Sequence, residues 1–414
     1  MNSVFVSSEI GKLEGVLLHK PGVEIERMSP KNFNEALFSD ILCKEIADTE
    51  YSNFAGVLSK FTTTYEIENL LQEVLKDEKL RKKIIKESCR FDDCEFLENE
   101  LEQLNSAELA KALIEGYAFN EENKHPEKYR DSRYILKPLY NLFYTRDTSS
   151  ALLNEVVINS MSSKVREKES FILQTIFQNY FKVPIINPLN FMPKARTEGG
   201  DILIAREDVL CIGNGKRTNK EGIEFLVSYF KERKANFNII VQELPDFQES
   251  FIHLDMVFTF LDKDKCMIYE PLIMKKQEFS NYETTLIKID NGNVSYHRKE
   301  NILEALKGLN MDLEPIQCGG SDRWNQDREQ WHSGANFFAM DAGKIIGYAR
   351  NNYTIEALNN AGFSVLKAED VCAGEVNMDD YKRFVVALKA SELPRAGGGA
   401  RCMTMPFRRE KLSW

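Results

Sequence analysis

The sequence predicts an α/β protein in which small sheets form a ring around an axis, with a helical segment inserted into the chain. Two observations lead to this fold class. The order strand, tight turn, strand, helix, strand recurs at residues 150–188, 201–244 and 335–369, and such repeated units are typical of propeller-like folds. Residues 66–135 follow a helical pattern instead. An ordinary α/β sheet, whose loop lengths can imitate a repeat, is the alternative.

The middle unit illustrates how each element is assigned. Two apolar runs flank a polar turn at 207–208, which is typical of a hairpin. Residues 221–233 have the spacing of an amphipathic helix, and 237–244 that of a strand. Partial units are expected at 14–26 and 256–272. Each complete unit carries an arginine where its hairpin leads into its helix, namely Arg166, Arg217 and Arg350.

The inserted segment is predicted to consist of several short helices. Its apolar residues recur at helical spacing among charges, at Leu70, Leu71, Val74, Leu75, Leu80 and Ile84. Asn105 and Ser106 break the pattern and cap a further helix. We therefore expect an all-helical insert domain at 66–135 and an α/β catalytic domain made of 1–65 and 136–414.

Composition narrows the classes of function. The net charge of −10 argues against a nucleic-acid partner, because contacts with phosphates need a basic face. No apolar run is long enough for a membrane span, and the N-terminus lacks the features of a secretory signal, so a cytoplasmic protein is expected. The eight cysteines include no C-x-x-C pair, so a zinc site is not expected.

The supply of histidine is short, with five in the chain. His125 and His297 lie in polar segments and are expected at the surface. His253 and Asp255 stand two apart at the predicted start of a strand, so their side chains should share one face. This pair is interpreted equally well as a solvent-facing edge or as part of a functional site. Cys402 follows three glycines, and it is either a small apolar residue or a nucleophile.

Further acidic residues indicate a site only when they are considered together. Glu198 and Asp201 flank two glycines, and Asp147 follows Arg146 in a loop. Alone, each is best interpreted as a polar turn. Paired carboxylates, however, suit a planar cation such as guanidinium, a histidine suits a general base, and a cysteine suits a nucleophile. A ring around an axis would bring these groups together.

At this point the sequence resembles the arginine deiminase family, a member of the guanidino-group-modifying (pentein) superfamily. The resemblance rests on "SEIGKLEGVLLHKPGVEIERMSP", "NLFYTRD", "EGGD", "IGNGKRTN", "HLDMVFT" and "GGGARCMTMPF", which span nearly the whole chain. It implies a five-fold pseudosymmetric ββαβ propeller with a helical insert. It also implies hydrolysis of L-arginine to citrulline and ammonia without metal or cofactor. A homo-oligomer, dimer or tetramer, is expected.

The resemblance also implies roles for residues in the matching motifs. Cys402 would attack the guanidinium carbon, and Asp147 and Asp255 would grip the guanidinium nitrogens. His253 would protonate the leaving ammonia and then activate water. The remaining matches have Glu198 orienting His253, Asp201 close by, and Asn141, Arg166 and Arg217 at the carboxylate end of the substrate.

The chain departs from the family pattern at several positions. Thr148 stands where many members have proline, and Ser39 where many have an acid. Gly397 aligns with an arginine that contacts the substrate carboxylate, and Arg395, two residues earlier, is the candidate to replace it. Alternatives therefore remain open. They are hydrolysis of another guanidine such as agmatine or peptidyl-arginine, amidino transfer, and a scaffold or binding protein of the same fold.

Two further expectations concern the nucleophile. Carboxylates around Cys402 should raise the pKa of its thiol, and a bound cationic substrate should lower it again. The three glycines before Cys402 should form a mobile loop that lets the backbone approach the substrate.

Overall fold

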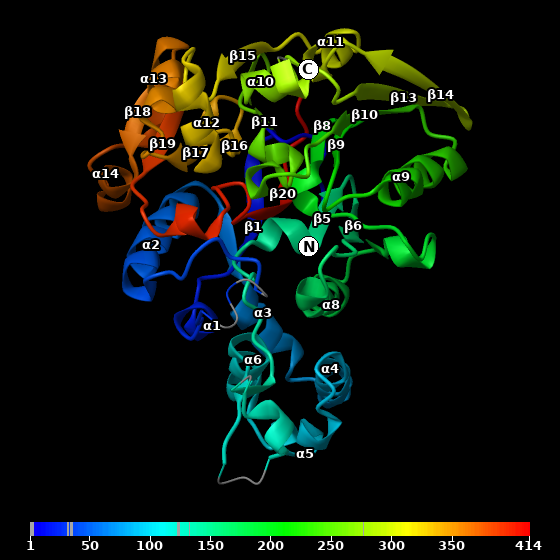
Figure 1. Cartoon of the computed structure of the whole chain (residues 1–414), viewed down its shortest axis with the longest axis vertical. Helices are drawn as coiled ribbons and strands as arrows, with labels where there is room; N and C mark the ends of the chain where they lie inside the picture. The colour runs from blue at the N-terminus through cyan, green and yellow to red at the C-terminus, as the bar shows by residue number, and fades with distance from the viewer. Residues whose placement is uncertain (1–3, 31–32, 34–35, 122–124, 132, 276) are drawn as a thin grey trace.

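The computed structural model describes residues 4–30, 33, 36–121, 125–131, 133–275 and 277–414. The two ends of the chain meet in one sheet, shown in Figure 1. In it β1 (Leu13–Leu18) pairs antiparallel with β20 (Met405–Arg409) and parallel with β2 (Thr63–Glu66). The segment that carries Cys402 is therefore tied to the start of the chain.

Within the described ranges, five sheets have three or more strands. One of the other four sheets consists of β5 (Ser149–Leu152), β6 (Glu155–Ile158) and β7 (Ile185–Ile186), and the largest consists of β8 (Ile202–Arg206), β9 (Val209–Asn214), β10 (Phe237–Glu243), β13 (Thr284–Asp290) and β14 (Asn293–Lys299). A further sheet consists of β11 (Phe258–Phe260), β12 (Lys265–Ile268) and β15 (Glu314–Gln317). The last consists of β16 (Phe338–Asp341), β17 (Lys344–Tyr348), β19 (Phe384–Leu388) and β18 (Ser364–Lys367). Four of them contain an antiparallel hairpin.

The three predicted units have the expected elements, but one differs in strand order. Their helices are α8 (Glu167–Ile176), α9 (Lys220–Glu232) and α13 (Asn352–Asn360). In the first two units the strand after the helix pairs parallel with the second hairpin strand, as in β6–β7 and β9–β10. In the third, β19 lies between β17 and β18. The predicted repeat is wrong in this unit, because β19, which comes later in the chain, pairs with β17 in the place expected for β18.

Helices α3 (Ile67–Val74), α4 (Glu78–Phe91), α5 (Glu98–Glu102) and α6 (Ser106–Glu115) occupy one end of the molecule (Figure 1). Asn105 caps α6 as predicted, in a capping box with Glu108. The prediction of an all-helical segment is wrong at its end, because β3 (Tyr117–Ala118) pairs with β4 (Tyr134–Leu136). These helices share one apolar cluster with β6, α8 and α9, so their apolar faces are buried against the sheets.

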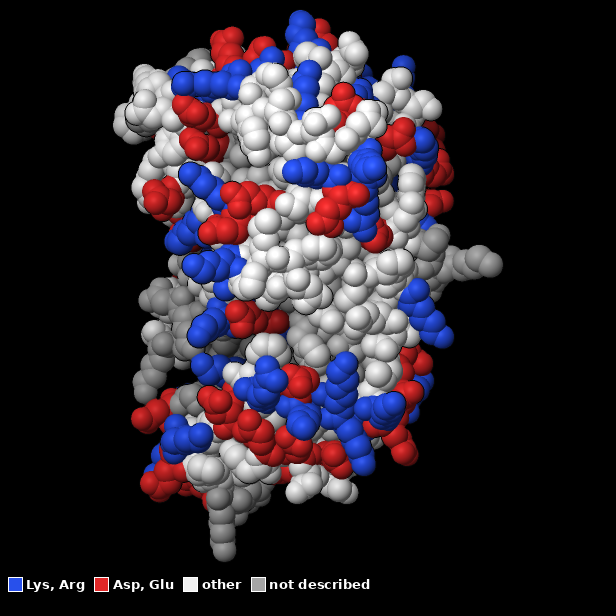
Figure 2. Space-filling view, turned by 90° about the vertical axis from the view of Figure 1, so that its right-hand side faces the viewer, with Lys and Arg blue, Asp and Glu red and all other residues white. Residues whose placement is uncertain are grey.

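The longest helix, α2 (Lys44–Phe61), was not predicted; it packs on α14 (Ala368–Ala373). The other α-helices are α1 (Val23–Glu26), α7 (Thr145–Thr148), α10 (Glu270–Ile273), α11 (Ile302–Lys307) and α12 (Arg323–Trp331). No helix in the described part of the chain is long and apolar enough to cross a membrane. Figure 2 shows acidic and basic side chains interspersed over one face of the molecule.

Candidate active site

A cavity of about 820 Å³ gathers most of the predicted site residues. Those that line it are Asn141, Asp147, Arg166, Glu198, Arg217, His253, Arg395 and Cys402. They come from loops and short helices in widely separated parts of the chain. Asp255 lies behind Cys402, with its Oδ2 4.0 Å from the Sγ atom. Asp201 is not among the lining residues.

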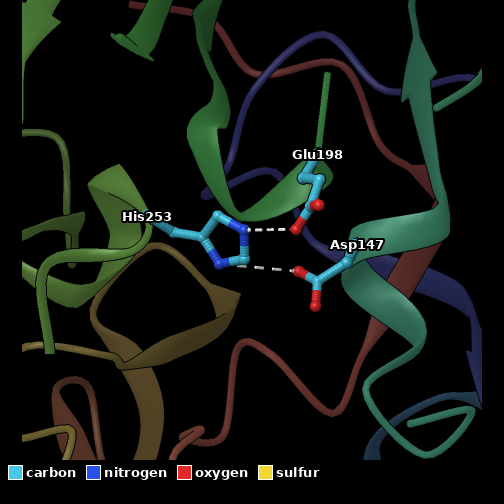
Figure 3. A group of neighbouring side chains, drawn as sticks. All are labelled: Asp147, Glu198 and His253. Carbon is cyan, nitrogen blue, oxygen red and sulfur yellow. Dashed lines mark hydrogen bonds and ion pairs between the residues drawn. The ribbon is translucent and has the colours of Figure 1, made fainter. Parts of the chain in front are cut away.

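His253 is buried between two carboxylates (Figure 3). Its Nε2 is 2.9 Å from Glu198 Oε2, and its Nδ1 is 3.8 Å from Asp147 Oδ1. Burial disfavours the charged ring, but Asp147, Glu198 and Asp201 outweigh it and raise the pKa of His253 to about 9. The ring is therefore an imidazolium at neutral pH. The interpretation as a solvent-facing strand pair is wrong, because residues 254–256 form a 3₁₀ turn before β11 and both side chains are buried.

Glu198 is held as an anion at the base of the cavity. Ser162 donates to its Oε1 from the backbone N (3.1 Å) and from Oγ (2.9 Å), and Arg217 lies 3.8 Å away. Burial acts against the charge, but the hydrogen bond to His253 and the charge of Arg217 lower the pKa of Glu198 to about 2. A Cβ on Gly200 would lie 2.5 Å from the His253 ring, so the glycine is needed for this close approach.

Asp147, Glu198 and His253 are close enough to share a metal ion, since their ligand atoms lie within 4.8 Å of one another. Their charges suit a different arrangement. Both ring nitrogens of His253 face carboxylates, and its pKa of about 9 keeps the ring protonated. A metal requires the neutral imidazole. The triad is thus best described as an imidazolium between two carboxylates.

The guanidinium of Arg166 is fully engaged inside the protein. It donates from NH1 to Asp147 Oδ2 (2.6 Å), from Nε to Glu169 Oε2 (2.8 Å) and from NH2 to the carbonyl oxygen of Asn141 (3.2 Å). The side-chain amide of Asn141 donates to Ala36 O at 2.6 Å. Asp147 Oδ1 has no hydrogen-bond partner although it is buried. Arg166 therefore holds Asp147 through Oδ2 and leaves Oδ1 without a hydrogen bond, 3.8 Å from His253 Nδ1.

Arg401 holds Asp255 in the way that Arg166 holds Asp147, and no sequence motif indicated this role. Its NH1 donates to Asp255 Oδ2 at 2.7 Å, and its other nitrogens bind Glu9 at 3.0 and 3.1 Å. All three residues are buried. Burial opposes the charge of Glu9, but Arg401 and Arg146 lower its pKa to about 2. Asp255 Oδ1, like Asp147 Oδ1, is buried without a partner.

The thiol of Cys402 lies in this acidic surrounding. Burial raises its pKa first, and the carboxylates of Asp255 and Asp147 raise it further. The expected direction of the pKa is therefore confirmed. In the free protein Cys402 is a thiol, next to two carboxylates that each have one buried oxygen without a hydrogen bond.

Comparisons with known proteins identify the family of the chain. The arginine deiminase family model matches residues 34–409. The chain belongs to the arginine deiminase family. It is 30% identical to an arginine deiminase of Borrelia garinii subsp. bavariensis over 100% of this chain and 99% of that one. It is 31% identical to an arginine deiminase of Listeria innocua, over 99% of both chains.

Solved structures share the fold at low sequence identity. One is a Pseudomonas aeruginosa dimethylarginine dimethylaminohydrolase mutant in complex with citrulline, with a TM-score of 0.53 and 11% identity over 96% of this chain and 100% of that one. Another is the N-terminal domain of ArgZ, a cyanobacterial arginine dihydrolase, bound to substrate, with a TM-score of 0.54 and 13% identity over 96% and 99%. The fold is thus the α/β pentein fold of these enzymes.

Of the glycines before Cys402, Gly397 and Gly398 line the cavity, and Gly398 and Gly399 also pack closely against other side chains. A Cβ on Gly398 would lie 2.4 Å from the ring of Tyr144, and one on Gly399 would lie 2.6 Å from Asn336 Oδ1. Gly397 has a φ of +98°, a conformation that a side chain disfavours. Close packing against Tyr144 and Asn336 is thus a further reason for glycine at 398 and 399, and the mobility of this loop stays a prediction.

Three predicted substrate contacts differ in what they touch. Arg395 lies on the rim and pairs with Asp40 (2.6 Å) and Glu392 (2.7 Å). Asp201 accepts from the backbone N of Leu254 at 2.9 Å, and burial raises its pKa to about 7, so it supports the His253 loop from behind the cavity. Arg217 lines the cavity, and its buried Nε has no hydrogen-bond partner.

One expectation about histidine is wrong elsewhere. His125 was expected at the surface, but its side chain is only 5% exposed and packs against Phe96, Tyr117 and Phe119. His297 is exposed as expected. Neither residue lines the cavity.

Proposed function

We propose that this member of the arginine deiminase family hydrolyses L-arginine to L-citrulline and ammonia through a covalent amidino-cysteine intermediate. One observation carries the proposal. Asp147 Oδ1 and Asp255 Oδ1 are both buried without a hydrogen bond, Asp255 lies next to the Cys402 thiol, and Asp147 lines the same cavity as Cys402. Two unpaired carboxylate oxygens in a buried site favour a planar cation with several N–H donors, which is the guanidinium group.

The reaction begins when the bound guanidinium brings a positive charge next to Cys402. This charge stabilises the thiolate form of Cys402, and the thiol loses its proton to solvent. The sulfur attacks the guanidinium carbon and forms a tetrahedral adduct. The imidazolium of His253 donates its Nδ1 proton to one nitrogen, the C–N bond breaks and ammonia leaves. The amidino-thioether remains on Cys402, and the His253 ring is now neutral.

The second half of the reaction uses the neutral ring as a base. His253 Nδ1 takes a proton from water as the water oxygen attacks the same carbon. The adduct collapses as its remaining hydroxyl proton passes to the sulfur, so the C–S bond breaks, the carbonyl of citrulline forms and Cys402 returns to the thiol. Glu198 orients the ring through Nε2 and stabilises its charged form. Asp147 and Asp255 hold the two guanidinium edges throughout.

The other end of the substrate is assigned to Arg217, whose Nε is unpaired at the cavity wall. Arg166 is better assigned to Asp147 than to a substrate carboxylate, because its donors are engaged. Asn141 and Arg395 also line the cavity, and we include both as contacts of the substrate's amino-acid end once it is bound.

The finer organisation is also a proposal. The five larger sheets support a five-fold pseudosymmetric propeller, in which 1–65 and 136–414 form the catalytic domain and 66–135 an insert. We further propose a homo-oligomer, dimer or tetramer, which light scattering of the purified protein tests. Each of the eight cysteines, all within the described ranges, is free, which supports a reducing, cytoplasmic location.

A citrulline colour assay with purified protein tests the function directly. Wild type with L-arginine should form citrulline and ammonia in equal amounts, and Cys402→Ala should form none. Agmatine, a peptide with an internal arginine, and an added amine acceptor should be poor substrates beside free arginine. The absence of citrulline from wild type would overturn the proposal, and turnover of agmatine alone would redirect it to another guanidine.

A further inference from the structure

The backbone on the N-terminal side of the nucleophile is held by two buried tyrosines. Tyr348 donates from its hydroxyl to Gly398 O at 2.9 Å. On the other side, the hydroxyl of Tyr144 accepts from Gly398 N, also at 2.9 Å. Tyr348 is 1% exposed and Tyr144 6%. One peptide position, four residues before Cys402, is thus fixed through both its donor and its acceptor.

The nucleophile itself is held by Asn336, whose side chain is buried. Its Oδ1 accepts from the backbone N of Arg401 (2.9 Å) and of Cys402 (3.3 Å). Its Nδ2 donates to the backbone oxygen of Asp255 at 3.2 Å. A single amide side chain therefore connects the backbone of the cysteine with that of one of the two carboxylates beside it.

The opposite side is connected to the second carboxylate. Arg146 donates from its backbone N to Cys402 O (3.1 Å) and from its Nε to Arg401 O (3.2 Å). Arg146 directly precedes Asp147 in the chain, and Tyr144 lies three residues before Asp147. The backbone of Cys402 is thereby connected by hydrogen bonds to both segments that carry the two carboxylates, directly to the Asp147 segment and through Asn336 to the Asp255 segment.

We propose that Tyr348, Tyr144 and Asn336 are positioning residues that fix Cys402 against the two guanidinium-binding carboxylates. The proposal rests on the proposed function and adds residues that do not react themselves. Their contribution comes from geometry, because attack on the guanidinium carbon needs the sulfur in line and at contact distance. Displacement of about 1 Å costs on the order of 100-fold in rate.

Tyr348→Phe is the cleanest test, because it removes one hydroxyl from a residue that does not line the cavity. Tyr269→Phe is the matched control, since Tyr269 is equally buried and its hydroxyl binds Asp327 away from the site. The measurements are kcat and KM for arginine, the melting temperature, and the rate at which chloroacetamidine, an amidinium reagent, alkylates Cys402.

We expect Tyr348→Phe to lower kcat and the alkylation rate about 10-fold each, with KM changed less than about twofold. Tyr269→Phe should leave all three values unchanged. A Tyr348→Phe protein that melts earlier but keeps wild-type kcat and alkylation would overturn the proposal and leave the hydroxyl a purely structural role. If Tyr348→Phe does not fold, Asn336→Ser is measured in the same way with the same criteria.

The alkylation rate separates this proposal from the proposed function. If wild type makes no citrulline, the function fails, yet the ratio of alkylation rates still reports whether the hydroxyl positions the thiol. If wild type is active and the ratio is one, only the positioning role fails.

Discussion

Replacing Glu198 by glutamine should lower the pKa of His253, the proposed proton donor, and so narrow the pH range in which the enzyme is active. Burial disfavours the charged His253 ring, but Asp147, Glu198 and Asp201 raise its pKa from 6.5 to about 9. That difference corresponds to roughly 3 kcal/mol in favour of the imidazolium. Glu198 supplies a hydrogen bond to a charged group, worth about 1.5–3 kcal/mol. In Glu198→Gln the pKa of His253 should therefore fall to about 7–8.

The sign of the effect follows from the proposed mechanism. His253 must be protonated to release ammonia, so activity is present below its pKa and is lost as pH rises through it. The alkaline limb of kcat should move from about pH 9 in wild type to about 7–8 in Glu198→Gln, measured by initial rates of citrulline formation. Glu232→Gln, at an exposed helix end, is the control. An alkaline limb that stays in place would refute the assigned coupling.

Three further predictions concern the charges around the thiol. Asp147→Asn should raise KM for arginine and lower kcat, in steady-state kinetics, because the residue binds the guanidinium before and during reaction; a fall in kcat alone would contradict this. Arg401→Met should destabilise the fold by about 3–5 kcal/mol in urea unfolding, because it leaves Glu9 and Asp255 buried without their partner; a loss below about 1 kcal/mol would count against it. The stability contributed by Glu9 should be present above its ordinary pKa of 4.5 and be lost as pH falls through about 2. Urea unfolding of Glu9→Gln across this range should show a weaker decline than wild type, and an equal decline would contradict the assignment.

Local patterns were sufficient for most of the repeated units. The hairpin β8–β9 and helix α9 follow from a polar two-residue turn and an amphipathic run, and both have their predicted positions. The place of β19 could not be predicted, because parallel pairing between distant strands leaves no local signal. The antiparallel pairing of β3 with β4 was missed because strands of two and three residues are too short to show a periodic pattern.

The site divides in a similar way. Residues within short motifs, such as Glu198 and His253, could be proposed from the sequence because residue type and spacing suggested chemistry. Arg401 binds Glu9 across 392 residues of chain, and no spacing rule connects them. The family resemblance assigns Arg166 to the substrate carboxylate, whereas its ion pairs with Asp147 and Glu169 are formed only by folding and have no signal in the sequence.

The central claim is that Cys402 attacks the guanidinium carbon of arginine and carries the amidino group. Rapid acid quenching during turnover, followed by mass spectrometry of the peptide that contains Cys402, measures this directly. The account predicts a mass increase on that cysteine equal to arginine less ammonia, and its absence in Cys402→Ala together with citrulline. Citrulline formation by Cys402→Ala, or an adduct on a different cysteine, would contradict it.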